Sequence, residues 1–317
     1  MAIERYSPST ALARVSPWTR LLEWSGWRTI PFAELQAKYE TPESRYIEID
    51  GTRVHYRIEG EGPTVLLLHG VLAQLQTWDG WVERLRKHYR LVRIDVPGFG
   101  LTGPLVNGNY APEYAVEFFE KTRKALGEEH FHLAGNSLGG FLSWYYAAKY
   151  PQHVGKLILL DPLCYPQRMP GLMRFSTLPL IRTISRYCVP RPFVADGVRQ
   201  VYGNQALVTR ETVDRYHQLL LREGNRGAMI DVFSTAGEHF AEGMTRGLWD
   251  SIPTIRAKTL LLWGEKDRWL PVTHVERWKR DLPGIEVKTY PGVGHIPMEE
   301  IPDQSAADAH EFLSRAP

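Results

Sequence analysis

Ser137, Asp267 and His295 have side chains that can act together in one reaction, although they lie far apart in the sequence. Ser137 stands in the run LAGNSLGG, which fits the pattern G-x-S-x-G. A serine hydroxyl is a weak nucleophile until a neighbouring base takes its proton, and that base needs an acid to orient it. The three residues therefore predict nucleophilic catalysis, with Ser137 as nucleophile, Asp267 as acid and His295 as base.

The residues around the serine predict a sharp turn with backbone donors beside it. HFHLA before the serine is typical of a strand and LGGFLSWYYAAKY after it of a helix, and Gly135 and Gly139 leave room for the bend. The start of that helix directs the N–H of Leu138 at the site. The strand TVLLL ends nearby in HG, so we expect Val71 and Leu138 to form an oxyanion hole through their N–H groups. His69 is interpreted as a structural residue that holds its turn.

The acid and the base each follow a segment expected to be a strand. TLLLWG precedes Asp267 and IEVKTY precedes His295, and both residues lie in the loop beyond. The loop before His295 contains two glycines and is expected to be flexible. Further candidates exist for both roles: Glu265 or Asp161 for the acid, and His274 or His310 for the base.

The surroundings of this site are expected to be apolar. We expect Leu72, Trp269 and Ile296 to line a pocket for a medium-sized apolar group. No G-K-[ST] follows a glycine cluster, and the histidines and aspartates lack the spacing of metal ligands. We therefore expect no cofactor and no metal.

Hydrophobic patterns along the chain predict the elements that must position these residues. RYIEI and RVHYRI flank an Asp-Gly pair, which is typical of a β-hairpin, and apolar strand-length runs then alternate with helical segments. This alternation predicts an α/β fold with a mostly parallel, helix-flanked sheet. It is interrupted after Asp161. We divide the chain into a leader arm (1–44), a core domain (45–161 and 251–317) and an inserted helical cap (162–250).

Composition limits the compartment and the partners. The 317 residues are 43% hydrophobic and 23% charged, as in folded proteins. The net charge of +2, without a block of Lys and Arg, argues against a nucleic acid partner. Cys164 and Cys188 are too few for a disulfide framework and fit a reducing compartment, so we expect a cytoplasmic protein.

The N-terminal arm allows a peripheral contact with a membrane through residues 14–28. No run of about 18 apolar residues could span a bilayer. The arm instead carries large apolar residues that could share a helical face, beside three arginines: Trp18, Leu21, Leu22, Trp24 and Trp27 with Arg14, Arg20 and Arg28. Such an arm lies either on a membrane surface or on the body of its own protein. We favour the second interpretation, since the apolar face is short.

From about Arg45 to Phe312, the chain resembles the α/β-hydrolase superfamily of serine hydrolases. The resemblance rests on the runs LLLHG, DVPGFGLTG, LAGNSLGG, LLWGEKDRWLP and PGVGHIPMEE. It implies an eight-stranded, mostly parallel sheet with a helical cap after the sixth strand. It also implies the roles already given to Ser137, Asp267 and His295, with Val71 and Leu138 as oxyanion donors.

The subfamily is narrowed by the residues at and around the nucleophile. Haloalkane dehalogenases and epoxide hydrolases carry an aspartate where this chain has Ser137, so both are disfavoured. GNSLGG and DRWLP resemble the carbon–carbon bond hydrolases that cleave vinylogous diketones formed by aromatic ring fission. Those enzymes usually carry a Gly- and Pro-rich oxyanion loop and often a Trp after the base, where this chain has HGVLAQLQTW and Ile296.

We therefore expect a hydrolase of small apolar carboxylic esters that works through an acyl-enzyme. Carbon–carbon bond hydrolysis is the alternative. A ligand-binding receptor on a hydrolase scaffold is an alternative of another class, because a fold and its site can be reused for recognition.

Overall fold

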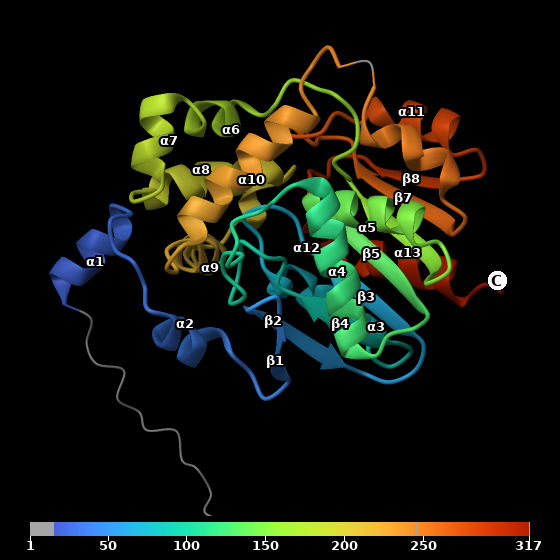
Figure 1. Ribbon diagram of the computed structural model, residues 1–317, viewed down its shortest axis with the longest axis horizontal. Helices are drawn as coiled ribbons and strands as arrows, with labels where there is room; N and C mark the ends of the chain where they lie inside the picture. The colour runs from blue at the N-terminus through green and yellow to red at the C-terminus, as the bar shows by residue number, and fades with distance from the viewer. Residues whose placement is uncertain (1–15, 245, 317) are drawn as a thin grey trace, which may run out of the picture.

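The computed structural model describes residues 16–244 and 246–316. Its centre is one eight-stranded sheet with the order β1-β2-β4-β3-β5-β6-β7-β8 (Figure 1). The strands are β1 (Ser44–Ile49), β2 (Thr52–Glu59), β3 (Thr64–Leu68), β4 (Arg90–Ile94), β5 (Phe131–Asn136), β6 (Val154–Leu160), β7 (Lys258–Gly264) and β8 (Glu286–Tyr290). From β4 to β8 every neighbouring pair is parallel. The predicted fold class is confirmed.

The hairpin at the edge of the sheet forms where the Asp-Gly pair predicted it. β1 and β2 pair antiparallel, and β2 pairs antiparallel with β4. Asp50 and Gly51 have φ values of 48° and 76°, so both adopt the left-handed conformation that a type I′ turn requires. These two strands account for the antiparallel part of the sheet.

Helices cover both faces of the sheet because its central strands are apolar along their whole length. The strand β3 has the sequence TVLLL and four buried residues. α3 (Asp79–Leu85) packs with α13 (Pro302–Ser314), and the indole N–H of Trp81 donates to the Ser305 hydroxyl between them. α4 (Pro112–Leu126) and α5 (Leu138–Lys149) lie on the opposite face (Figure 1). The α11 (His274–Asp281) and α12 (Pro297–Glu300) helices complete the core.

Between β6 and β7 the chain leaves the sheet and forms a group of helices, in the region expected to be a cap. They are α6 (Gly171–Ser176), α7 (Pro179–Ser185), α8 (Arg191–Val201), α9 (Arg210–Leu220) and α10 (Asn225–His239), with the 3₁₀ helices η2 (Gln205–Leu207) and η3 (Leu248–Thr254). No strand forms in the described part of this segment. We keep the name cap for residues 162–250, and their standing as a separate domain stays our prediction.

The described part of the leader arm contains two helices, α1 (Pro17–Trp24) and α2 (Phe32–Tyr39). Ile30 and Leu35 pack against Leu219 and Leu221 of the cap. The arm therefore contacts the body of the protein, as favoured, but α1 has no buried residue and its large apolar side chains take no part in this packing. Arg14 lies outside the described residues. No helix in the described ranges has the length and apolar character needed to cross a bilayer.

Candidate active site

Ser137 occupies the sharp turn between β5 and α5. Its φ of 54° and ψ of −115° are a strained conformation for a residue with a side chain, and it is held by hydrogen bonds from Ser137 N to Leu160 O and from Leu163 N to Ser137 O. A Cβ on Gly135 would lie 2.2 Å from Gly139 O, and one on Gly139 would lie 2.1 Å from Leu68 O. The two flanking glycines are therefore required by close backbone approach.

His295 and Asp267 are joined by a hydrogen bond. His295 Nδ1 donates to Asp267 Oδ2 at 2.6 Å, while Asp267 Oδ1 accepts from the N–H groups of Trp269 and Leu270 at 2.7 and 3.0 Å. The second imidazole nitrogen, Nε2, is buried and has no hydrogen-bond partner among the described residues. Ser137 and His295 line the same cavity. This arrangement leaves Nε2 free to accept a proton from a group in that cavity.

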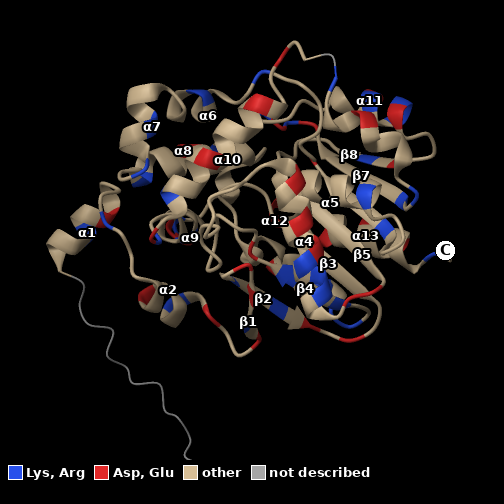
Figure 2. Cartoon of the chain, viewed as in Figure 1, with Lys and Arg blue, Asp and Glu red and all other residues tan. Residues whose placement is uncertain are grey.

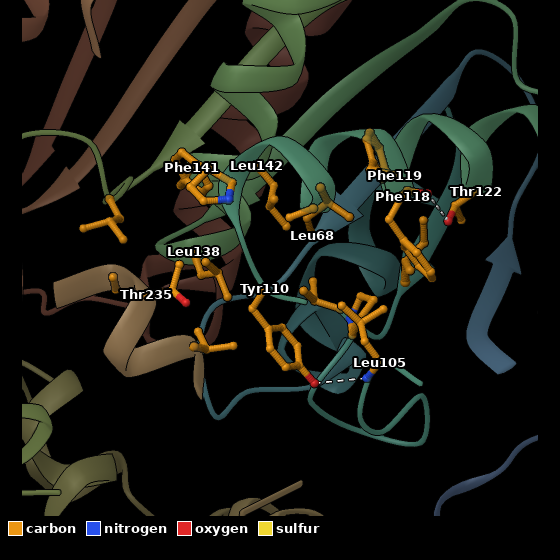
Figure 3. A pocket seen from close by; sticks show the side chains of 18 of the residues that line it. Leu68, Leu105, Tyr110, Phe118, Phe119, Thr122, Leu138, Phe141, Leu142 and Thr235 are labelled. Carbon is orange, nitrogen blue, oxygen red and sulfur yellow. Dashed lines mark hydrogen bonds between the residues drawn. The ribbon is translucent and has the colours of Figure 1, made fainter. Parts of the chain in front are cut away.

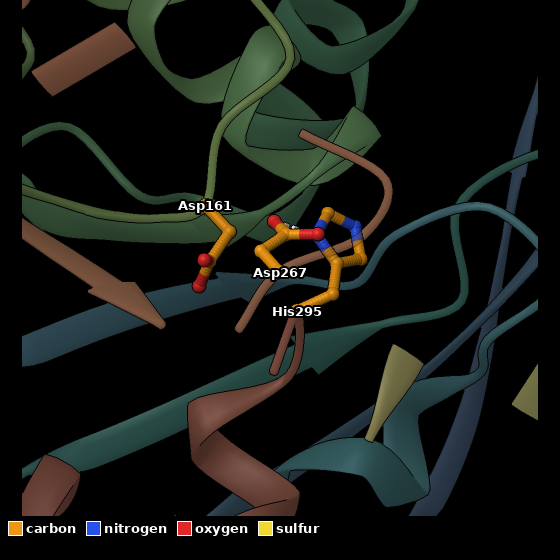
Figure 4. A group of neighbouring side chains, drawn as sticks. All are labelled: Asp161, Asp267 and His295. Carbon is orange, nitrogen blue, oxygen red and sulfur yellow. Dashed lines mark hydrogen bonds and ion pairs between the residues drawn. The ribbon is translucent and has the colours of Figure 1, made fainter. Parts of the chain in front are cut away.

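Asp161 lies on the other side of Asp267 from the imidazole, as Figure 4 shows. The ligand atoms of Asp161, Asp267 and His295 lie within 4.8 Å of one another. Burial, together with the negative charge of Asp267, raises the pKa of the Asp161 carboxyl well above its usual value, and Gly264 N–H donates to its Oδ1 at 2.9 Å. Two carboxylates and an imidazole could hold a cation. Because Asp161 favours its protonated form, we interpret the group as an acid pair behind a histidine.

Glu265, His274 and His310 lie away from this group. The carboxylate of Glu265 accepts from the hydroxyl of Thr289. His274 packs against Tyr165 and Trp263, and His310 Nδ1 lies 3.0 Å from the hydroxyl of Tyr89. Besides Asp267, only Asp161 among the candidate acids approaches the imidazole of His295.

The loop after β3 lies directly against the serine. A Cβ on Gly70 would lie 2.9 Å from Ser137 Cβ, so a glycine is needed there for Val71 to approach. Val71 lines the cavity of Ser137, and neither the Val71 N–H nor the Leu138 N–H has an acceptor in the described chain. The next residue, Leu72, has a φ of 61°, which indicates strain in the loop. Val71 and Leu138 as oxyanion donors stay a prediction, which is supported by the lack of an acceptor for either N–H group among the described residues.

The turn of this loop is held by His69. His69 Nδ1 donates to Gly70 O at 2.8 Å, and His69 Nε2 accepts from Val96 N at 2.9 Å. Burial lowers the pKa of His69, which keeps the ring neutral so that one nitrogen can donate and the other accept. These hydrogen bonds agree with the interpretation of His69 as a structural residue that holds its turn.

Two residues that hold the histidine loop escaped the sequence analysis. The amide of Asn136 donates to His295 O at 2.9 Å and to Leu160 O at 3.1 Å. The carboxylate of Glu300 accepts from Gly294 N in this loop and from Gly203 N and Asn204 N in the cap. A Cβ on Gly294 would lie 2.4 Å from Val201 O. The loop is therefore clamped, and the expectation that its glycines make it flexible is wrong.

An apolar cavity opens in front of Ser137. Leu72, Trp269 and Ile296 lie in its wall, as expected, and the cap contributes residues that include Leu172, Phe193, Val198, Met229 and Phe233. Within the described chain, no Lys, Arg, Asp or Glu lines this cavity. Its side chains with polar atoms are Asn136, Ser137, Tyr216, Trp269 and His295; the hydroxyl of Tyr216 already donates to Glu299, whereas the indole N–H of Trp269 has no partner in the described chain. The cavity therefore suits an uncharged, apolar molecule.

The side chain of Leu138 lines a second apolar cavity (Figure 3). α4, α5 and α10 line it with residues such as Phe118, Phe141 and Thr235. The hydroxyl of Tyr110 donates neither to Ser137 nor to His295 but accepts from Leu105 N. The Leu138 side chain points into this cavity, which leaves only its backbone N–H for the site of Ser137.

Comparisons with known proteins place the fold and point to several reactions. The family model described as alpha/beta hydrolase fold matches residues 63–180. A 2-hydroxy-6-oxononadienedioate/2-hydroxy-6-oxononatrienedioate hydrolase of Comamonas testosteroni is 26% identical, over 87% of this chain and 98% of its own length. The monoacylglycerol lipase abhd6-B of Xenopus laevis is 29% identical, over 80% of this chain and 76% of its own.

A solved structure shares both fold and sequence with this chain. It is described as a membrane phospholipase A and a bacterial virulence factor, and it matches with a TM-score of 0.74 and 27% identity. The alignment covers 89% of this chain and 91% of the other. The matched proteins thus include hydrolases of dienedioates and of lipid esters.

Proposed function

Because this chain is a hydrolase of the α/β-hydrolase superfamily, we propose that it cleaves uncharged carboxylic esters with an apolar acyl or alcohol group. Ser137 acts as nucleophile, His295 as base and Asp267 as the acid that orients it. The N–H groups of Val71 and Leu138 bind the oxyanion. The observation that carries the proposal is the apolar cavity in front of Ser137, whose wall contains no charged side chain in the described chain.

The reaction proceeds in two halves. Ser137 Oγ attacks the ester carbonyl while its proton moves to His295 Nε2, and the negative charge that develops on the carbonyl oxygen is met by the two N–H groups. His295 then protonates the departing alkoxide, which leaves an acyl-serine. Water attacks the acyl group, again losing its proton to His295 Nε2; the bond between the acyl carbon and Ser137 Oγ then breaks as His295 returns the proton to Oγ, and the carboxylic acid is released.

The cavity argues for an ester rather than an anionic diketone. A dienedioate carries two carboxylates, and a buried carboxylate requires a cation or several hydrogen-bond donors. The described wall offers no cation; its unpartnered donors are the indole N–H of Trp269 and the N–H of Val71, and the amide of Asn136 is already bonded to backbone oxygens. An uncharged ester fills the same space without this cost.

Carbon–carbon bond hydrolysis is a second candidate, because hydrolases of 2-hydroxy-6-oxo-dienedioates and -dienoates are prominent among the curated relatives. Such a substrate has a carbonyl that the serine or an activated water could attack in the same place. The receptor hypothesis has weaker support, since the matched relatives are hydrolases.

The test compares p-nitrophenyl esters of increasing acyl length with a 2-hydroxy-6-oxo-dienoate. We expect turnover of the esters, loss of at least ~10⁴-fold in kcat for Ser137→Ala, and labelling of the wild type by a fluorophosphonate. His295→Asn should behave like Ser137→Ala, whereas the matched control His310→Asn should keep wild-type kcat. Turnover of the dienoate alone would assign the second candidate, and ester turnover that survives Ser137→Ala would refute the mechanism.

A further inference from the structure

Large apolar side chains are exposed in two segments of the chain. One segment is α1 with the turn after it, and the other runs through α6 and α7. They hold ten of these side chains: Trp18, Leu21, Leu22, Trp24, Trp27, Phe175, Leu178, Leu180, Ile184 and Tyr187. Elsewhere in the described chain only Val106, Leu207 and Met244 are exposed large hydrophobics. We call the ten side chains together the α1–α7 surface.

The two segments lie next to each other although about 150 residues separate them. Val189 N donates to Gly26 O at 3.3 Å, and the Cys188 thiol donates to Ser25 O at 3.2 Å. A Cβ on Gly26 would lie 2.1 Å from Val189 O, so the turn after α1 sits tightly against the chain that leaves α7. Figure 1 shows α1 and α7 at the same end of the molecule, opposite the C-terminus.

Nothing in the described chain covers this surface. Trp18 is 74% exposed and Leu180 is 71% exposed. The Ser16 hydroxyl accepts from Thr19 N, so the sequence caps and maintains a helix that buries none of its own residues. Each Å² of apolar surface left in water costs about 25 cal/mol of free energy relative to burial. Large exposed apolar patches therefore mark sites of contact with a partner or a membrane.

The charge around the surface selects the kind of partner. Residues 162–195 contain no Asp or Glu but five arginines: Arg168, Arg174, Arg182, Arg186 and Arg191. Figure 2 accordingly shows basic and no acidic residues on α6 and α7. The last three arginines pair with Asp231 or Asp214 of neighbouring helices. Arg168 and Arg174, and Arg20 on α1, form no ion pair with a described residue, so they are available to an external anion.

We propose that the α1–α7 surface docks the protein on an anionic lipid bilayer. Tryptophan, leucine and arginine side chains are combined here as they are in interfacial helices, where the aromatic and aliphatic groups enter the headgroup region and the arginines meet lipid phosphates. A second copy of this chain would bring the same positive charges together and is therefore a poorer occupant.

The docked surface is the outer side of the wall that encloses the cavity of Ser137. Leu172 of α6 lines the cavity, while Phe175, one helical turn later, belongs to the exposed surface. The ring of Phe175 lies 6.3 Å from that of Phe193, which also lines the cavity. Docking would therefore set the cap against the lipid, where apolar esters are dissolved.

The experiment measures co-sedimentation of the full chain with phosphatidylcholine vesicles, with and without phosphatidylglycerol. We expect binding that needs phosphatidylglycerol and weakens with added salt. Leu21→Ser/Leu22→Ser and Leu180→Ser/Ile184→Ser should each weaken binding about a hundredfold, because each large side chain is worth about tenfold when buried. Arg20→Gln/Arg174→Gln should reduce binding and its salt dependence. The matched control Val106→Ser/Leu207→Ser removes exposed apolar side chains elsewhere and should bind like the wild type.

Three results would overturn the proposal. They are no binding to either vesicle, equal binding by the surface and control variants, or a wild-type dimer in light scattering that the same substitutions convert to a monomer. The last result would assign the surface to a second copy. Hydrolysis of a short soluble ester, measured in parallel, keeps the two proposals apart: the surface variants should retain it, and Ser137→Ala should lose it while still binding vesicles.

Discussion

The carboxyl group of Asp161 faces that of Asp267 across a gap of at most 4.8 Å between ligand atoms, and both are screened from water. Two ionised carboxylates so close together would repel each other strongly. One of them must keep its proton, and Asp161 is the one with its pKa raised by burial and by Asp267. Asp267 Oδ2 accepts from the imidazole Nδ1 of His295 at 2.6 Å on its other side.

Asp161→Asn should increase stability at neutral pH. The folded pKa of Asp161 lies above its unfolded value of 3.8, so its stabilising contribution is complete below about pH 4 and is lost as the pH rises toward the folded pKa. The loss can reach about 1.4 kcal/mol per pH unit within that window. The asparagine amide oxygen can still accept from Gly264 N–H, but asparagine does not titrate, so its stability contribution does not change with pH. The Tm difference between variant and wild type should therefore widen from pH 5 to pH 8.

Asp95→Asn is the matched control with the opposite sign. Burial acts to raise the pKa of Asp95, but the hydrogen bonds from His55 and from Leu101 N, together with electrostatic interactions with His55 and His69, outweigh it and leave the pKa lowered. The ionised carboxylate of Asp95 therefore stabilises the fold at pH values above its unfolded pKa, and this stabilisation is lost as the pH falls through its folded pKa. Asp95→Asn lacks it and should be less stable than the wild type at neutral pH. Equal Tm changes with pH in both variants would contradict the acid-pair interpretation.

Gly70→Ala should lower kcat by about 10- to 100-fold, since small displacements of reacting groups cost this much. The new methyl would lie 2.9 Å from Ser137 Cβ and 3.0 Å from Asn136 Oδ1, so the loop bearing Val71 must retreat from the serine. Ester kinetics measure the effect. Gly171→Ala adds a methyl that meets nothing within 4 Å and should leave kcat unchanged.

Asn136→Ala should lower kcat, and this loss should exceed what its loss of folding stability alone would cause. The substitution removes the amide that donates to His295 O, so the loop that carries the base loses one of the hydrogen bonds that hold it in place. Asn225 is a matched control, because its buried amide also donates to two backbone oxygens, Gly100 O and Leu219 O, but away from the site. Asn225→Ala should lose a similar amount of stability, read from urea midpoints, and keep its kcat. Equal losses of kcat in the two variants would count against a role for Asn136 in positioning.

Gly197→Val should shift the preference toward short esters. Gly197 lines the cavity of Ser137, and even a Cβ there would lie 3.0 Å from Leu172 Cδ2, so larger side chains narrow the space. Each methylene that can no longer be buried reduces kcat/KM about fourfold. An acyl-length series measures the effect, and Gly237→Val, at a position with open space outside the cavity, should leave the series unchanged.

The strands themselves and the separate parts of the site follow from local patterns, whereas the order of the strands in the sheet depends on pairing between distant segments. The apolar runs, the Asp-Gly hairpin and the glycines around Ser137 act within a few residues, which is why each could be predicted. Asn136 and Glu300 could not, because their partners lie 159 residues away or in the cap. The exposure of α1 also escaped prediction, since an apolar helical face looks the same in sequence whether it is buried or left in water.

The hydrogen bond from His295 N to Val201 O, at 2.8 Å, ties the base to the end of α8, and Glu300 reinforces the tie. If the cap moved away from the sheet to admit an ester, this hydrogen bond would move His295 with the cap and away from Ser137. The position of the base thus depends on the position of the cap, so we expect hydrolysis to require the cap contacts of His295 and Glu300 to be intact.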